Sequence, residues 1–320
     1  MATRMDRSAV LASKIRDALA PCSLGAWPTA LTAHPELARA LDMAALWLKR
    51  EDLAGGNKVR GLEFLLTGVP PRSVFMTIGG AGSSHCLATA RAARAIDCRC
   101  ALAVFPQPDT DASRRVAEEM TQTAQLIMRA ASRVTFPWAV LRAWRAAHHL
   151  GRGKPRWIPG GGADPRAVVG HLLATLELES QLDAPPDAIV VPLGTGGTAA
   201  GIALGIAWLG WSTRVVAVRV APWIVANGWR TRRLASKAAT LLRQQRIDFS
   251  VPRASIRIEI VDALGEGYGY PSEEGERARE LAKGRGVALD PTYGAKAFSV
   301  FLRPETNIQR AVFWHTFPSS

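Results

Sequence analysis

Hydrophobic and polar positions follow two alternating patterns along the 320-residue chain. Short runs of apolar, often β-branched residues predict strands at 45–49, 73–78, 100–105, 188–193 and 214–220. Segments with helical spacing follow several of these runs and predict helices at 58–66, 85–96 and 198–209. Strands that alternate with helices are typical of βα units with parallel sheets, so the predicted fold class is α/β, with helices covering the sheet faces.

The length is compatible with one large or two moderate domains. Glycine and proline are dense in residues 151–165, GRGKPRWIPGGGADP. We interpret this segment as a crossing between domains or as an active-site loop, and a plain surface loop is the alternative.

The formal net charge is +13, which is compatible with nucleic acid, an anionic membrane or an anionic small molecule as a partner. The densest basic run, residues 229–246, is typical of a helix with one solvated basic face. No stretch combines basic with interleaved aromatic residues, so no nucleic-acid partner is predicted.

The cysteines are unevenly placed, at Cys22, Cys86, Cys98 and Cys100. This arrangement does not predict a disulfide framework, and no second pair or histidine cluster completes a metal site beside Cys98 and Cys100. Free thiols favour a reducing compartment. The sequence has no apolar signal region at its start and no run as long as a membrane span, so the expectation is a cytoplasmic protein without a membrane partner.

Three glycine-bearing turns each follow a predicted strand and precede a predicted helix, at 55–58, 79–85 and 194–198. The carboxyl ends of strands are where α/β proteins bind ligands. In the third turn, GTGGT, glycines allow backbone N–H groups to surround an anion, and the helix N-terminus favours negative charge. The spacing is neither that of a Walker A loop nor that of a dinucleotide fingerprint, so the turn indicates a single phosphate. A structural glycine turn is the alternative.

The second turn places Ser83, Ser84 and His85 at a helix start. These side chains could hold a carboxylate. The alternatives are that a serine caps the helix and that His85 faces solvent.

The first turn places Lys58 directly after Gly55, Gly56 and Asn57. The helix dipole and partial burial would lower the pKa of its amine, which makes it a nucleophile and a base. A lysine beside a single-phosphate loop indicates an aldehyde cofactor held as a Schiff base, and pyridoxal phosphate has the required aldehyde and single phosphate.

The segment LWLKREDLAGGNKVRGLEFLL resembles the lysine segment of the 1-aminocyclopropane-1-carboxylate deaminase and D-cysteine desulfhydrase family. The resemblance continues through TIGGAGSSHCLATARAARAI, VVPLGTGGTAAGIALG and VALDPTYGAKA, from about Trp27 onward. It implies fold type II: two three-layer α/β/α domains with mostly parallel sheets and pyridoxal phosphate in the cleft between them. It further implies a larger domain of residues 1–60 and 166–320, a smaller domain of residues 61–165, and a homodimer.

The resemblance also implies roles for individual residues. Lys58 would form the Schiff base and move the α-proton. Ser83 would lie over the substrate, Ser84 would face the phenolic oxygen of the cofactor and the substrate, and His85 would help to bind the substrate. The phosphate would be bound by Gly194, Thr195, Gly196, Gly197 and Thr198.

Tyr268 and Tyr293 resemble the two family tyrosines and would close on the substrate as catalytic groups. Thr316 would serve the pyridine nitrogen. The chain departs from the family in four places. The loop at 51–55 is short, Gly82 and Ser84 replace a glutamine and an asparagine, Gly294 follows Tyr293, and the C-terminal segment lacks two glycines.

The predicted function is therefore that of a lyase or deaminase that acts on a small amino acid and releases ammonia and a keto acid. One alternative is a racemase or a β-replacement enzyme of the same fold. The other is a cofactor-binding homologue that has lost turnover.

Overall fold

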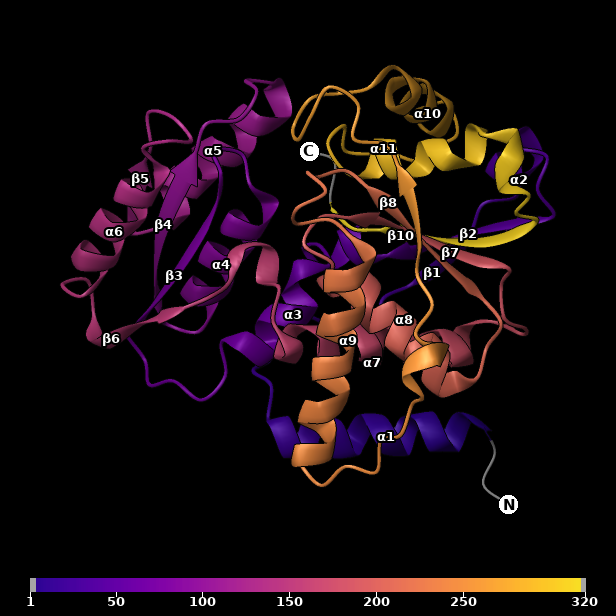
Figure 1. The fold of residues 1–320 in the computed structure, drawn as a ribbon, viewed down its shortest axis with the longest axis horizontal. Coiled ribbons are helices and arrows are strands. Elements are labelled where there is room, and N and C mark those ends of the chain that lie inside the picture. Colours follow the sequence, from indigo (N-terminus) through magenta and orange to yellow (C-terminus); the bar gives the residue numbers. More distant parts are fainter. Residues whose placement is uncertain (1–3, 318–320) are drawn as a thin grey trace.

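The fold contains two sheets in which nearly all neighbouring strands run parallel (Figure 1). The computed structural model describes residues 4–317. Residues 1–3 and 318–320, which belong to the predicted larger domain and to the divergent C-terminal segment, lie outside the described residues. No helix within residues 4–317 combines the length and the apolar character that crossing a bilayer requires.

The larger sheet has the strand order β1-β2-β10-β7-β8-β9. β1 is antiparallel to β2, and the other neighbours are parallel. In the order of the sheet, the strands are Leu31–Ala33 (β1), Ala45–Arg50 (β2), Arg310–His315 (β10), Ala188–Leu193 (β7), Arg214–Arg219 (β8) and Glu259–Asp262 (β9).

The smaller sheet is fully parallel, with the order β5-β4-β3-β6. Its strands, again in the order of the sheet, are Leu126–Arg129 (β5), Arg99–Phe105 (β4), Ser73–Gly80 (β3) and Arg152–Trp157 (β6). All of these strands lie between positions 73 and 157, whereas the strands of the larger sheet lie outside this range. The domain limits at 60 and 165 remain a prediction.

Helices cover both faces of the larger sheet. Alternate residues of β7 show this: Ile189 and Val191 belong to one core, and Val190 belongs to the core on the opposite face. The first core is closed by Arg4–Leu19 (α1), Pro165–Gln181 (α7), Gly197–Leu209 (α8) and Gly228–Gln244 (α9). The second is closed by Pro35–Ala40 (α2), Glu273–Lys283 (α10) and Gly294–Phe298 (α11).

The smaller sheet is covered in the same way, and it stands beside the larger one in Figure 1. One face packs on Ser84–Ala95 (α4) and Asp111–Thr123 (α5), and the other packs on Phe136–Ala147 (α6). A further helix, Lys58–Leu65 (α3), contributes Leu62 to a core of the smaller sheet and Phe64 to a core of the larger one. α3 therefore joins the two parts of the molecule.

Short 3₁₀ helices complete the described secondary structure, at Glu51–Ala54, Gly160–Gly162, Arg253–Ser255, Ser299–Leu302 and Pro304–Thr306. The strands and helices predicted from the sequence are all present, with ends that differ by at most two residues. The predicted α/β fold class is confirmed.

The interpretation of residues 151–165 as a loop or linker was wrong for its first half. Residues Arg152–Trp157 form β6, which pairs with β3 at the edge of the smaller sheet. Pro155 misled the prediction, because proline is excluded from central strands but is tolerated at a sheet edge. The second half contains no strand or α-helix before α7, only the short 3₁₀ helix Gly160–Gly162, and part of it lines the cavity described next.

Candidate active site

A cavity of about 600 Å³ opens where strands of both sheets end. Its walls include the segments that follow β3, β6, β7, β8, β9 and β10, and the start of α3. Carboxyl ends of parallel strands are the usual place for a ligand site in this fold class. Every site residue predicted from the sequence lines this one cavity: Lys58, Ser83, Ser84, His85, Gly194, Thr195, Gly196, Gly197, Thr198, Tyr268, Tyr293 and Thr316.

The turn between β7 and α8 forms a cradle for an anion. Gly196 has φ +92°, a backbone conformation that residues with a Cβ rarely adopt, and a Cβ there would lie 2.7 Å from Thr231 Oγ1. A Cβ at Gly194 would meet nothing within 4 Å, so the space above the turn is open. The N–H groups of the first turn of α8 have no partner within the helix, and they favour an anion at this position.

Lys58 is the first residue of α3, and its Nζ donates a hydrogen bond to the carbonyl oxygen of Gly161 at 3.0 Å. Burial lowers the pKa of the Lys58 amine to about 8. No carboxylate within residues 4–317 pairs with this amine. Lys58 therefore has the accessible, partly deprotonated amine that condensation with an aldehyde requires.

Ser83 caps α4: its Oγ accepts a hydrogen bond from the N–H of Cys86 at 3.3 Å. The capping interpretation is therefore correct, although Ser83 also lines the cavity. His85 does not face solvent. It is 4 % exposed, its Nε2 contacts Thr77 Oγ1 at 2.9 Å, and burial, followed by the charge of Lys58, lowers its pKa to about 3. His85 is thus a neutral side chain in the cavity wall.

Tyr268 and Tyr293 meet at the cavity. Their hydroxyl oxygens lie 2.5 Å apart, and their rings pack edge to face with centroids 6.1 Å apart. Burial raises the pKa of both phenols, and for Tyr293 the neighbouring Tyr268 adds to this effect. Both phenols are therefore protonated at neutral pH and can serve as proton donors.

The turns that carry these tyrosines are held by buried groups. The Asp290 carboxylate accepts hydrogen bonds from the N–H groups of Tyr293 and Gly294 at 2.7 and 2.8 Å. A Cβ at Gly294 would lie 2.8 Å from Asp290 Oδ2, so the glycine allows this close approach of the carboxylate. The amine of Lys296 donates to the carbonyl oxygens of Leu264 and Gly267, in the segment that precedes Tyr268.

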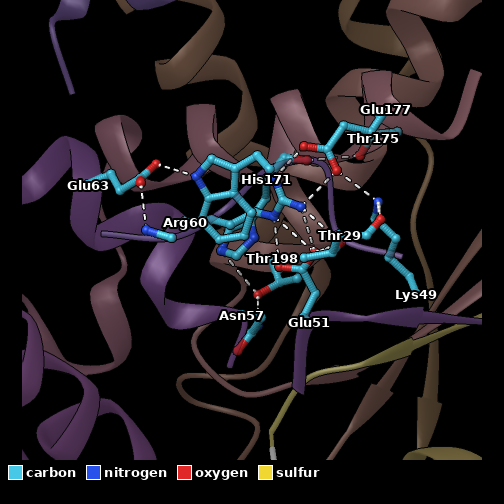
Figure 2. A network of polar contacts seen from close by, with 12 residues as sticks. Thr29, Lys49, Glu51, Asn57, Arg60, Glu63, His171, Thr175, Glu177 and Thr198 are labelled. Atoms are coloured by element: carbon cyan, nitrogen blue, oxygen red, sulfur yellow. Dashed lines mark hydrogen bonds and ion pairs between the residues drawn. The ribbon is translucent and has the colours of Figure 1, made fainter. Parts of the chain in front are cut away.

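A buried polar network lies beside the cavity and joins α3 to α7 (Figure 2). The guanidinium of Arg60 pairs with Glu51 and Glu177, both at 2.7 Å, and lies 3.9 Å from the centre of the Trp27 ring. Lys49 pairs with Glu177 at 2.8 Å. These ion pairs fix the helix that begins with Lys58.

The sequence interpretation missed several residues that line the cavity: Asn57, Phe105, Arg133, Phe136, Ile224 and Arg230. Asn57 could have been suspected, because it directly precedes Lys58. Arg133 and Arg230 come from distant loops and helices, and no local pattern marks them.

The residues present fit pyridoxal phosphate. The amine of Lys58 can condense with the aldehyde of this cofactor. The cradle at 194–198, with open space at Gly194, can hold its single phosphate.

Comparison with known proteins agrees with this fit. A model of the family described as "Pyridoxal-phosphate dependent enzyme" matches residues 22–316. The chain belongs to this family, in the group that contains the 1-aminocyclopropane-1-carboxylate (ACC) deaminases and D-cysteine desulfhydrases, and pyridoxal phosphate is its cofactor.

Three curated relatives illustrate the group. A Pyrococcus horikoshii protein, provisionally named an ACC deaminase, is 30% identical over 85% of this chain and 82% of its own. The bifunctional D-cysteine desulfhydrase/ACC deaminase of Arabidopsis thaliana is 32% identical over 79% of this chain and 65% of its own. Nocardicin C-9' epimerase of Nocardia uniformis is 33% identical over 84% of this chain and 85% of its own.

Among solved structures, one titled as an ACC deaminase homologue superposes with a TM-score of 0.77 at 28% identity. The match covers 95% of this chain and 94% of that chain.

Proposed function

We propose that this protein is a pyridoxal-phosphate-dependent lyase that releases ammonia and a keto acid from a small amino acid, in the manner of the ACC deaminases and D-cysteine desulfhydrases. One observation carries the proposal: the cavity contains an amine with a lowered pKa, Lys58, and two phenols with raised pKa values, Tyr268 and Tyr293. Groups whose pKa values are shifted apart in one site define a base and an acid.

In this proposal, Lys58 and the cradle at 194–198 would hold pyridoxal phosphate, which would supply an electron sink for a bond that breaks at the α-carbon. With cysteine or serine, the amine of Lys58 would remove the proton of the α-carbon. ACC has no proton on its α-carbon, so with ACC the amine would remove a proton from one ring carbon instead. The hydroxyl of Tyr293, backed by Tyr268, gives a proton to the leaving group or to the carbon released when a ring opens. One base and one separate acid are what elimination and ring opening need.

The remaining side chains would orient the substrate and the cofactor. Ser83 and Ser84 are proposed to face the substrate carboxylate and the cofactor ring, and neutral His85 to contact the substrate without adding charge. Thr316 follows β10 and lies in the same wall, where its hydroxyl is proposed to serve the pyridine nitrogen.

The test is product release from a panel of ACC and of the D- and L-forms of cysteine and serine. We expect at least one of them to yield equimolar ammonia and keto acid, with Lys58→Ala as the inactive control. If the holoenzyme binds these amino acids, as shown by a change in its visible spectrum, but releases no keto acid, the lyase proposal fails, and an epimerase or a homologue without turnover remains.

The similarity to nocardicin C-9' epimerase supports a second candidate, a racemase or epimerase. Such an enzyme returns a proton to the α-carbon and releases no keto acid. Chiral chromatography of the recovered substrate, together with uptake of deuterium from D₂O, separates the two candidates.

We further propose a cytoplasmic homodimer. The free cysteines at positions 22, 86, 98 and 100 support a reducing compartment, and the family resemblance supports a dimer. Light scattering of the purified holoenzyme tests the dimer.

A further inference from the structure

Three side chains, one directly before α3 and one each from α7 and α8, meet behind the phosphate cradle (Figure 2). Asn57 directly precedes α3, Thr198 is the second residue of α8, and His171 lies in α7. Asn57 Nδ2 donates to Thr198 Oγ1 at 2.7 Å, and His171 Nε2 lies 3.4 Å from the same oxygen.

The Asn57 side chain is not used to cap its own helix, although asparagine at this position commonly does so. Its amide points instead to Thr198, and its backbone N–H donates to the carbonyl oxygen of Thr316 at 2.8 Å. Asn57 thus connects the start of the lysine helix to the phosphate cradle.

His171 reaches Thr198 because α7 and α8 approach each other closely. A Cβ at Gly201, three residues after Thr198, would lie only 2.4 Å from His171 Cβ. Because Gly201 has no side chain, the two helices can approach closely enough for His171 to contact Thr198. His171 is 3 % exposed.

The position of the proton on the His171 ring follows from its surroundings. Burial, and then the positive charges of Lys58 and Arg60, lower its pKa well below the ordinary value, so the ring is neutral and carries one proton. Among the described residues, Nδ1 is buried and has no hydrogen-bond partner. A proton on Nδ1 would leave a buried donor unsatisfied, whereas a proton on Nε2 is shared with Thr198 Oγ1. The ring therefore donates from Nε2.

With Asn57 and His171 both donating to it, Thr198 Oγ1 has no lone pair left to accept another hydrogen bond. Its own proton must then be donated elsewhere, and Thr198 lines the cavity at the phosphate cradle. A phosphate offers only acceptor oxygens, so a hydroxyl fixed as a donor suits it better than one that is free to rotate.

We propose that Asn57 and His171 are positioning residues that hold the Thr198 hydroxyl as a hydrogen-bond donor to the phosphate of the cofactor. This role rests on the cofactor of the family and not on the reaction proposed above. It makes the site selective for the phosphorylated form of the cofactor.

The experiment titrates the full-length protein, freed of cofactor, with pyridoxal phosphate and with pyridoxal, which has the same aldehyde but no phosphate. Since Lys58 reacts with both aldehydes, the ratio of the two dissociation constants reports the phosphate contacts. We expect Thr198→Val to lower the affinity for pyridoxal phosphate by ~10-fold or more, because one charge-assisted hydrogen bond is lost. The affinity for pyridoxal should not change. Thr198→Ser keeps the hydroxyl and should bind like the parent protein.

The deciding measurement is a double-mutant cycle. Introduced into the parent protein, His171→Met should lower the affinity for pyridoxal phosphate by roughly threefold or more. Introduced into Thr198→Val, it should have no further effect, since the hydroxyl that His171 orients is gone. His171→Gln, whose amide can still donate, should recover most of the affinity. These results would support the proposal.

Three results would each overturn the proposal: additive losses of affinity in the double variant, equal losses of affinity for pyridoxal and pyridoxal phosphate, or no loss of affinity at all. If His171→Met does not accumulate as folded protein, the same cycle with Asn57→Leu and Thr198→Val gives the decision. The ³¹P chemical shift of the bound cofactor is an independent readout: it should move in Thr198→Val and His171→Met and not in Thr198→Ser, and an unchanged shift would contradict the proposal.

Discussion

Lys58 Nζ lies 3.0 Å from the carbonyl oxygen of Gly161, although 103 positions separate the two residues in the chain. The hydrogen bond joins the start of α3 to the loop after β6, and both residues line the same cavity. A neutral carbonyl group is a weak partner for an amine, and it leaves Lys58 free to react.

The attachment site of the cofactor is the first prediction. Borohydride reduction of the holoenzyme followed by mass spectrometry should place the pyridoxyl group on Lys58. Two buried lysines are already engaged, Lys49 with Glu177 and Lys296 with the carbonyl oxygens of Leu264 and Gly267. An adduct on Lys49 or Lys296 would refute the assignment.

The second prediction concerns pH. Burial lowers the pKa of Lys58 from 10.5 to about 8, and only the neutral amine attacks an aldehyde. The rate constant for cofactor association, measured by stopped-flow absorbance, should therefore rise with pH through about 8 and level off above it. Pyridoxine 5'-phosphate, which has no aldehyde, should lack this rise. A rate that keeps climbing toward pH 10.5 would contradict the lowered pKa.

The third prediction concerns the tyrosine pair. Tyr293→Phe removes the hydroxyl that lies 2.5 Å from Tyr268 Oη and keeps the ring. Loss of an acid–base group should lower kcat by roughly 10²–10⁴, with little change in Tm or in the visible spectrum of the cofactor. Tyr270→Phe, at a ring that is 43 % exposed, is the matched control and should behave like the parent enzyme. Equal turnover in both variants would exclude a role for the Tyr293 hydroxyl in acid–base chemistry.

The fourth prediction concerns the phosphate cradle. Gly196→Asp adds a carboxylate beside the proposed phosphate and a Cβ 2.7 Å from Thr231 Oγ1, so cofactor occupancy should fall sharply. Gly286→Asp is the control, because Gly286 also has positive φ, +77°, and has no neighbour within 4 Å of its Cβ position. Both variants carry the same kind of backbone strain, and only Gly196→Asp should lose the cofactor in an absorbance titration. Full occupancy in a folded Gly196→Asp variant would remove this turn from the site.

The fifth prediction concerns the network around Arg60. Arg60 is 2 % exposed, and Arg60→Met would leave the carboxylate of Glu51 buried without its guanidinium partner. The free energy of unfolding should fall by about 3–5 kcal/mol. Arg91→Met breaks an exposed ion pair, in which the side chains of Arg91 and Glu119 are 43 and 39 % exposed. This variant should lower the free energy of unfolding by no more than about 1 kcal/mol. Urea denaturation of both variants measures the difference, and similar losses would show that burial does not control the effect.

Local patterns in the sequence were sufficient to predict the strand before each glycine turn, the helix after it, and the placement of Lys58 at a helix start. These features depend on alternation over a few residues and on backbone conformations such as that of Gly196, so short segments encode them. The same patterns left β6 unrecognised. A strand at a sheet edge tolerates Pro155, and its pairing with β3 is visible only in three dimensions.

What the tertiary structure alone decided is which of these segments meet. The β10 strand, at positions 310–315, inserts between β2 and β7 and thereby brings Thr316 beside Asn57. The hydrogen bond between Asn57 and Thr198 spans 141 positions, and that between Tyr268 and Tyr293 depends on turns held by Asp290 and Lys296. Such contacts follow from the order of strands in the sheet and from the packing of helices on it, and no local pattern of polar and apolar residues determines either of them.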